Sequence, residues 1–162
     1  MNALDLLSLL RSRYAKRAAN GPTWAFIEQV RNAAGFNATR TADAIAMALW
    51  PSRGLELHGF EIKVSRSDWL RELKDPSKAV VELVDRWWIV APESVVHPSE
   101  LLPSWGLLVA RNDRWLVSAV RAERLRGPRY CGEYELAREP LPPGITRSSL
   151  AALLRAAVKV RE

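Results

Sequence analysis

The sequence predicts a domain of the α/β or α+β class, with a mixed central sheet flanked by helices. Segments of helical and of strand periodicity follow one another in the order helix, strand, strand, helix, strand, with further strands after them. The chain has 162 residues, which is the common size of one domain and too short for two large ones. Of these residues 48% are hydrophobic, which is enough for one packed core. We therefore expect residues 1–162 to form a single domain.

Two helices are expected at the start of the chain. Leucines at helical spacing predict an amphipathic helix over residues 3–18, which ends before an Asn-Gly-Pro sequence. A Pro-Thr pair then provides a second start signal, and apolar residues spaced three or four apart predict a helix over residues 23–34. Gly35 closes this second helix.

Two strands joined by a turn follow these helices. From Thr41 to Leu49, both alternating sets of residues are largely apolar, which is typical of a strand buried on both faces, and Asp43 is the one charge in that run. Residues 50–54 contain Pro and Gly and predict a turn. Residues 55–64 are again strand-like, so the pair is expected to form a hairpin.

The second half of the sequence adds a helix, a strand and a hairpin. Ser65 to Ser67 provide capping side chains for a helix, and Pro76 interrupts it and begins a further helix. Residues 87–91 form a compact apolar strand. Residues 106–110 and 115–120 flank a polar turn and predict a hairpin.

Residues 121–147 are rich in Arg, Pro and Gly and give no clear periodicity. After them, Ser148 or Ser149 caps a terminal helix that runs through Val158.

Composition restricts the classes of protein that fit. The single cysteine, Cys131, cannot form an internal disulfide, and with only His58 and His97 it cannot complete a zinc tetrahedron. The N-terminal segment has its charges in the reverse order of a secretory signal, and no apolar run approaches the roughly 20 residues of a membrane span. We expect a cytoplasmic protein with no membrane association.

The charge is unevenly distributed along the chain. The formal net charge is +6, with 7 basic and 4 acidic residues over 1–60, 6 and 8 over 61–100, and 11 and 6 over 101–162. An acidic centre that attracts a metal ion, flanked by basic surface that attracts phosphate, fits this distribution. A solvated arginine surface is the alternative interpretation.

One set of residues carries candidate chemistry. Glu61 and Lys63 are two apart on a predicted strand, so their side chains leave the same face roughly 6 to 7 Å apart. Ile62 points to the opposite face, while its backbone carbonyl remains available as a neutral oxygen ligand. If residues 50–54 form the hairpin turn, Asp43 comes beside Glu61, and two carboxylates and one ammonium group converge at the strand ends.

These residue types suit a divalent cation. Mg²⁺ and Mn²⁺ prefer carboxylate, carbonyl and water oxygens, and Asp43 and Glu61 would supply the carboxylates. Lys63 would lie beside the attacking water or the phosphate, where its charge stabilises a transition state. Burying an unpaired carboxylate is costly, so the alternative is that Asp43 forms an ion pair with Lys63 or Arg40 and performs no chemistry.

The motif resembles that of the PD-(D/E)XK nuclease superfamily, in which an Asp on one strand precedes Glu-x-Lys on the next. Asp43 and the sequence Glu61-Ile62-Lys63 match it, although Ala42 stands where the motif has Pro. The wider runs 40–43, 59–65 and 85–90 resemble the MmcB-like branch associated with DNA repair, and related phage and bacterial proteins. The resemblance covers about residues 24–92.

The resemblance implies a restriction-endonuclease-like core at about residues 23–92, with 100–162 as additional strands, a basic loop and a C-terminal helix. It implies a metal-dependent nuclease that hydrolyses DNA phosphodiester bonds, in DNA repair or in the processing of phage or mobile-element DNA. Asp43, Glu61 and Lys63 would be the catalytic residues. Mg²⁺ or Mn²⁺ would bind Asp43, Glu61 and the Ile62 carbonyl. Glu28, on the predicted helix 23–34, matches an acidic helix residue that assists metal binding in the family, with a solvent-facing glutamate as the alternative.

DNA is the expected partner, and a homodimer is compatible with cleavage of both strands. The candidate residues for phosphate contact are basic side chains near the motif or in the basic loop: Arg40, Arg66, Lys78, Arg121, Arg124, Arg126 and Arg129. A solvated loop and a capping role for the serines beside Arg66 remain alternatives. Two other functions also remain open, a nucleic-acid-binding module without catalysis and a purely structural partner protein.

Overall fold

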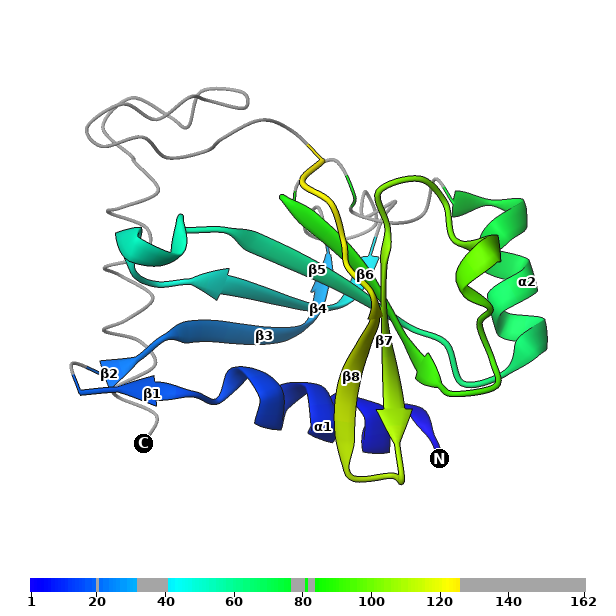
Figure 1. The fold of residues 1–162 in the computed structure, drawn as a ribbon, viewed down its shortest axis with the longest axis horizontal. Helices are drawn as coiled ribbons and strands as arrows, with labels where there is room; N and C mark the ends of the chain where they lie inside the picture. Colours follow the sequence, from blue (N-terminus) through cyan, green and yellow to red (C-terminus); the bar gives the residue numbers. More distant parts are fainter. Residues whose placement is uncertain (20, 32–40, 77–80, 82–83, 126–162) are drawn as a thin grey trace.

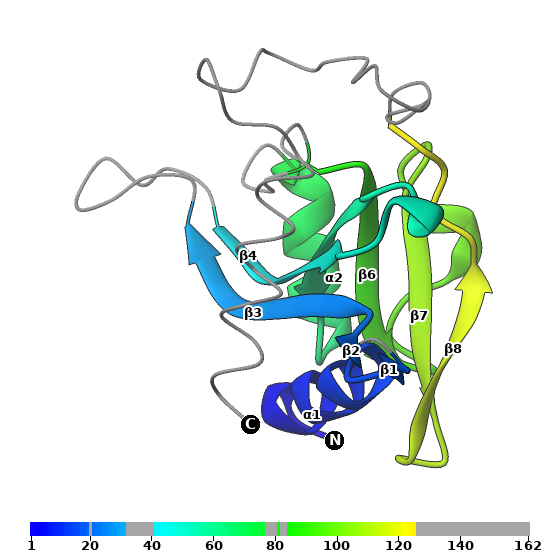
Figure 2. The same ribbon diagram turned by 90° about the vertical axis from the view of Figure 1, so that its left-hand side faces the viewer.

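A computed structural model describes residues 1–19, 21–31, 41–76, 81 and 84–125. The chain forms an α+β fold in which a six-stranded mixed sheet has helix α1 (Ala3–Tyr14) packed on one face (Figure 1). Helix α2 (Arg66–Lys74) lies against the other face (Figure 2). The predicted mixed sheet is therefore confirmed.

The six strands lie side by side in chain order. They are β3 (Trp24–Arg31), β4 (Thr41–Ala48), β5 (Leu57–Ile62), β6 (Arg86–Pro92), β7 (Gly106–Arg111) and β8 (Trp115–Val120). The pairs at the two ends of the sheet, β3 with β4, β4 with β5 and β7 with β8, are antiparallel. The central pairs, β5 with β6 and β6 with β7, are parallel.

The predicted hairpin between the two motif strands is confirmed. β4 and β5 pair antiparallel, and the turn between them contains the 3-10 helix η2 (Pro51–Arg53). Gly54 ends this turn at a φ of 70°, a left-handed conformation that glycine adopts without a steric penalty. The strand predicted over residues 87–91 and the hairpin of β7 and β8 are also confirmed.

Helix α1 forms because it has a strong start and an apolar face. The Asn2 side chain accepts a hydrogen bond from the Asp5 backbone N–H, and the Asp5 carboxylate accepts one from the Asn2 backbone N–H, so the first turn has a capping box. Leu6, Leu10 and Tyr14 are buried against the sheet. The helix ends four residues before the predicted end at residue 18, because β1 (Arg17–Ala18) pairs with β2 (Gly21–Pro22) in a small ribbon.

The helix predicted over residues 23–34 is wrong, because residues 24–31 form strand β3. Trp24 and Phe26 lie two residues apart on one face of this strand. Both contact the Tyr14 ring, with distances between ring centroids of 5.0 and 6.1 Å. Aromatic and β-branched residues favour strands, and the free edge of β4 offers a partner along this whole segment. Tertiary pairing therefore overrides the helical spacing of Trp24, Ile27 and Val30.

The second face of the sheet carries α2 and its own apolar cluster. The Ser65 side chain caps the helix by accepting a hydrogen bond from the Asp68 backbone, as predicted. Trp69 is fully buried in one cluster with Trp87 and Ile89. Gly59 allows this packing, because a Cβ there would lie 2.5 Å from the Trp87 ring.

Two predicted helices lie outside the described residues. The helix expected after Pro76 falls largely on residues 77–80 and 82–83, and the terminal helix falls on residues 148–158. Within the described part of the chain, no helix is long and apolar enough to cross a membrane.

Candidate functional site

The motif residues meet where β4 begins and β5 ends. The regular register pairs Ala44 with Phe60, so the next position along each strand places Asp43 opposite Glu61. The Asp43 carboxylate accepts a hydrogen bond from the Ile62 backbone N–H at 2.7 Å. The aspartate therefore takes the place of a backbone acceptor at the point where the two strands separate.

The backbone of Ile62 also faces this place. In a strand, the N–H and the C=O of one residue point toward the same neighbouring strand, and those of the next residue point toward the other neighbour. The Lys63 N–H bonds to the Val90 carbonyl of β6, whereas the Ile62 N–H bonds to Asp43. The Ile62 carbonyl therefore faces the Asp43 side, while its side chain is buried in the core below α1.

Lys63 lies between two carboxylates. Its Nζ atom donates to Glu61 Oε1 at 2.9 Å, and it lies 2.8 Å from Oε2 of Glu72 on α2. The side chains of Lys63 and Glu72 are each only 7% exposed, so this is a buried ion pair. The predicted convergence of Asp43, Glu61 and Lys63 is present in the structure.

Glu72 is a residue of this site that the sequence analysis missed. It lies one helical turn after Trp69, on the face of α2 that packs against the sheet. A charged residue three positions after a buried tryptophan is the signal that points to it. One of its carboxylate oxygens, Oε1, is buried without a hydrogen-bond partner among the described residues.

Burial and mutual repulsion disfavour the charged forms of the acids. Burial, and then the charge of Asp43, raise the pKa of Glu61 to about 7. Burial also raises the pKa of Asp43, although the hydrogen bond from Ile62 and the charge of Lys63 oppose this. Burial disfavours the Lys63 ammonium, but Glu61 and Glu72 outweigh it and raise the lysine pKa. The site thus holds more negative charge than its single lysine neutralises.

The donor atoms at this place suit a hard divalent cation. Asp43 and Glu61 offer carboxylate oxygens and Ile62 offers a carbonyl, which is the donor chemistry of Mg²⁺ and Mn²⁺. Within the described ranges, no group of three His, Cys, Asp or Glu residues is arranged to hold a metal ion. The set is therefore a partial one, of the kind in which Mg²⁺ keeps waters and substrate phosphate oxygens as further ligands.

Glu28 is not brought to this group. It lies on strand β3 rather than on a helix, and it pairs with Ala44, whose side chain is buried on the α1 face of the sheet. The Arg11 guanidinium donates to its carboxylate at 2.8 and 2.5 Å. Asp43 precedes Ala44 in β4 and faces the opposite side, so the sheet separates the two acids.

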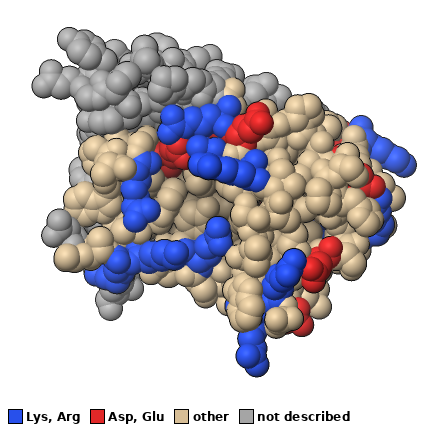
Figure 3. All heavy atoms as spheres, in the orientation of Figure 1, with Lys and Arg blue, Asp and Glu red and all other residues tan. Residues whose placement is uncertain are grey.

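The described basic candidates mostly have acidic partners. Arg66 forms a bidentate ion pair with Glu100, and two nitrogens of the Arg124 guanidinium donate to a single Glu56 oxygen. Arg121 is exposed. On the face shown in Figure 3, basic side chains lie in separate groups, several with acidic neighbours. The other candidates, Arg40, Lys78, Arg126 and Arg129, lie outside the described residues.

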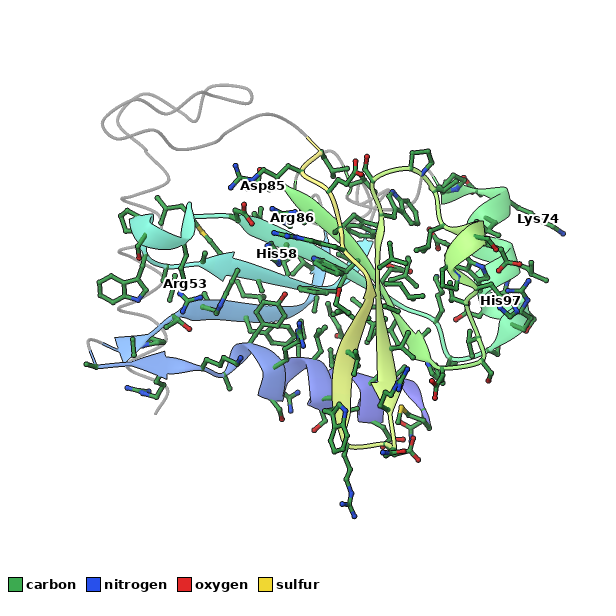
Figure 4. All side chains as sticks on the ribbon, viewed as in Figure 1. Arg53, His58, Lys74, Asp85, Arg86 and His97 are labelled. Carbon is green, nitrogen blue, oxygen red and sulfur yellow. The ribbon has the colours of Figure 1, made fainter. Side chains whose placement is uncertain are left out.

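A second polar cluster surrounds Glu56 at the other end of β5. His58 Nε2 lies 3.2 Å from Glu56, and His58 Nδ1 lies 3.0 Å from the Tyr14 hydroxyl. Burial opposes ionisation of Glu56, but hydrogen bonds from His58, Arg86 and Arg124 hold its pKa well below the usual range. His58 and Arg86 lie together, on the other side of the molecule from Lys74 at the end of α2 and His97 beside that helix (Figure 4). As the strand alternation predicts, His58 faces away from Glu61.

Fold and site together define an α+β protein with an acidic, lysine-containing centre at the edge of its motif hairpin. The fold is similar to that of the SPO1766 protein of unknown function from Silicibacter pomeroyi. The two chains share 21% sequence identity with a TM-score of 0.52, over 94% of this chain and 84% of the other. No family model and no curated protein matches the chain. At this identity, the likeness shows the fold alone.

Proposed function

We propose that the protein is a metal-dependent nuclease that hydrolyses DNA phosphodiester bonds. One observation carries the proposal. Two largely buried carboxylates, those of Asp43 and Glu61, lie opposite each other on one face of the β4–β5 hairpin, and burial together with the charge of Asp43 raises the pKa of Glu61. A divalent cation bound between the two carboxylates relieves this repulsion.

Each residue has a separate role in this proposal. Asp43, Glu61 and the Ile62 carbonyl hold the cation, which when bound lowers the pKa of a coordinated water and neutralises charge on the phosphate. Asp43 also fixes the end of β5 through its hydrogen bond to Ile62. Lys63 keeps a positive charge within the site, where it orients the nucleophile or stabilises the charge of the transition state.

The arrangement of elements supports the same proposal. The motif hairpin of β4 and β5, the parallel strand β6 and the helix α2 between them occur in the order expected of a restriction-endonuclease-like core. The match of Asp43 and Glu61-Ile62-Lys63 to the motif favours the PD-(D/E)XK superfamily and a role in DNA repair or in phage or mobile-element DNA processing. DNA as partner, and a homodimer for cleavage of both strands, belong to the same proposal.

Replacement of single side chains tests the division of roles. Asp43→Ala and Glu61→Ala should lose Mn²⁺ binding, and both should cleave plasmid and linear DNA at least about 100-fold more slowly. Lys63→Ala should keep Mn²⁺ binding and lose cleavage to a similar extent. Glu28→Ala is the matched control, because it removes a carboxylate from the opposite face of the same sheet. Calorimetry measures binding, and gel assays with Mg²⁺ or a chelator measure cleavage.

Circular dichroism and thermal unfolding establish that each variant remains folded. Cleavage that survives in folded forms of all three motif variants would remove the nuclease assignment. Loss of activity in Glu28→Ala to the same degree would show that the assay does not report on this site.

A nucleic-acid-binding module without catalysis is the second candidate function. The observation that favours it is the pairing of Lys63 with both Glu61 and Glu72, which already neutralises part of the acidic charge. This candidate predicts DNA affinity that falls linearly with the logarithm of salt concentration, and no cleavage with any divalent cation.

A further inference from the structure

The environment of Glu72 raises a question that the motif alone does not answer. A buried carboxylate normally has both its oxygens engaged in hydrogen bonds, because leaving a buried polar atom without a partner is costly. Glu72 Oε2 contacts the Lys63 ammonium at 2.8 Å, but Glu72 Oε1 is buried and has no hydrogen-bond partner among the described residues. The glutamate therefore has an unused acceptor directly beside the lysine.

The hydrogen-bond capacity of Lys63 is shared between two acids. An ammonium group has three N–H donors, and here one contacts Glu61 Oε1 at 2.9 Å while another is directed to Glu72. A cation bound by Asp43 and Glu61 competes with this ammonium for the Glu61 carboxylate, because both are positive and are attracted to the same group.

The charge balance has the same implication. With Asp43, Glu61, Glu72 and Lys63 all ionised, these four residues carry a net charge of −2, which one divalent cation neutralises. The cation bound at Glu61 repels the Lys63 ammonium. This repulsion decreases if the ammonium moves away from Glu61 while it stays within the site. Glu72 is the acid on the side away from the strands, because it comes from α2.

We propose that Glu72 is a second anchor for Lys63 and takes over the ammonium completely when a divalent cation binds Glu61. The free oxygen of Glu72 accepts the hydrogen bond that Glu61 gives up, so Lys63 stays fully paired in both states. Glu72 is thus a positioning residue: it contacts neither the cation nor the phosphate, and it sets where the lysine charge lies. This inference rests on the proposed function, since it requires a cation at Glu61.

A double-mutant cycle on cation affinity tests this coupling without measuring cleavage. Calorimetry with Mn²⁺ compares the unmodified protein with Glu72→Gln, Lys63→Met and the double variant. Glu72→Gln should weaken binding about tenfold when Lys63 is present, because the ammonium then stays on Glu61 and must be displaced. In the Lys63→Met protein there is no ammonium to displace, so the same change should reduce affinity less than about twofold.

Asp68→Asn is the matched control for the loss of one negative charge. Asp68 lies one turn before Glu72 on α2, and its charge acts on Asp43. Its replacement should change affinity equally with and without Lys63, because its effect acts through space. Thermal unfolding of each protein verifies that it is folded.

The outcomes separate this inference from the function on which it rests. An equal loss for Glu72→Gln in both backgrounds would make Glu72 a direct ligand and overturn the inference while leaving the metal site intact. An unchanged affinity in Glu72→Gln would overturn it as well. Absence of Mn²⁺ binding by the unmodified protein would overturn the proposed function together with the inference.

A second measurement serves if Lys63→Met does not fold. A crystal structure of the unmodified protein with Mg²⁺ bound should place Lys63 Nζ within hydrogen-bond distance of both Glu72 oxygens and away from Glu61. A lysine that still bridges Glu61 and Glu72 beside the bound cation would contradict the proposal.

Discussion

Ionisation of Glu61 lowers the stability of the fold between weakly acidic and neutral pH. Its ordinary pKa is 4.5, and in the fold it is raised to about 7, first by burial and then by the charge of Asp43. Between these values the folded protein retains a proton that the unfolded chain releases. The free energy of unfolding therefore falls as pH rises through this range, by about 3 kcal/mol at roughly 1.4 kcal/mol per pKa unit.

Urea unfolding in the presence of a chelator, from pH 4.5 to 7.5, measures this effect. The unmodified protein should lose stability as pH rises, and Glu61→Gln should show a much flatter profile because its side chain does not ionise. Glu56 and Glu100 do not obscure the comparison. Burial raises the pKa of Glu56, but its hydrogen bonds outweigh burial and hold that pKa below the ordinary value. Hydrogen bonds also lower the pKa of Glu100, so neither acid titrates in this pH range. Identical slopes for the two proteins would show that Glu61 is not destabilised by its charge.

At the residue scale, the sequence predicted correctly those residues of the site for which the two-residue period of a strand and the spacing of the motif lead to the same placement. Asp43, Glu61 and Lys63 are brought together because they lie on paired or adjacent strand positions, which a period of two determines. Glu72 could not be found in the same way, because its contact depends on how α2 docks on the sheet. Glu28 was assigned to a helix, and the actual strand places it on the opposite face.

At the scale of elements, Glu56 links two strands to the segment that follows β8. Its carboxylate accepts from Arg86 Nε at 2.9 Å and from Arg124, and the Arg86 guanidinium also donates to the Ala122 carbonyl. The Glu56 side chain is 11% exposed, so its negative charge is needed to balance two guanidinium groups with little help from water. The end of β5 remote from the motif is therefore held by electrostatics.

Replacing Glu56 should destabilise the fold. Glu56→Gln removes the carboxylate that Arg86 and Arg124 share, and breaking a largely buried ion pair costs about 3 kcal/mol or more. Glu93→Gln is the control, since Glu93 and Arg111 form an exposed pair at 3.4 Å and such pairs contribute about 1 kcal/mol or less. Urea unfolding at neutral pH gives both values. A loss in Glu56→Gln no larger than in Glu93→Gln would mean that the cluster contributes little to stability.

The elements that sequence patterns predicted correctly are those with strong local signals. Ser65 caps α2, the apolar run of β6 is compact, and Pro51 and Gly54 mark the turn between β4 and β5. The failure at β3 is physical, because its apolar residues fit a helical spacing as well as a strand. Only the long-range partners of β3, the edge of β4 and the Tyr14 ring, decide between the two.

At the scale of the whole molecule, the sheet separates two environments. On the α1 face, aromatic rings and the cluster around Glu56 fill the interior. On the α2 face, a tryptophan-rich core lies beside the acidic centre that contains Lys63. The two charged clusters therefore lie at opposite ends of β5, each beside an apolar core on its own face of the sheet.

The sequence predicted the class of fold and the mixed sheet, because periodicity and hydrophobic content are properties of the chain alone. The docking of α2, and with it the complete set of side chains around Lys63, depends on contacts between distant segments. The basic net charge of +6 is compatible with a polyanionic partner. The decisive tests concern the acidic centre.

Anomalous diffraction from a crystal soaked in Mn²⁺ tests the central claim most directly. We predict a manganese peak coordinated by carboxylate oxygens of Asp43 and Glu61, and no such peak in a crystal of Asp43→Ala treated in the same way. No bound manganese at these two acids under saturating conditions, with Lys63 still joining Glu61 to Glu72, would contradict the claim that this cluster is a cation site.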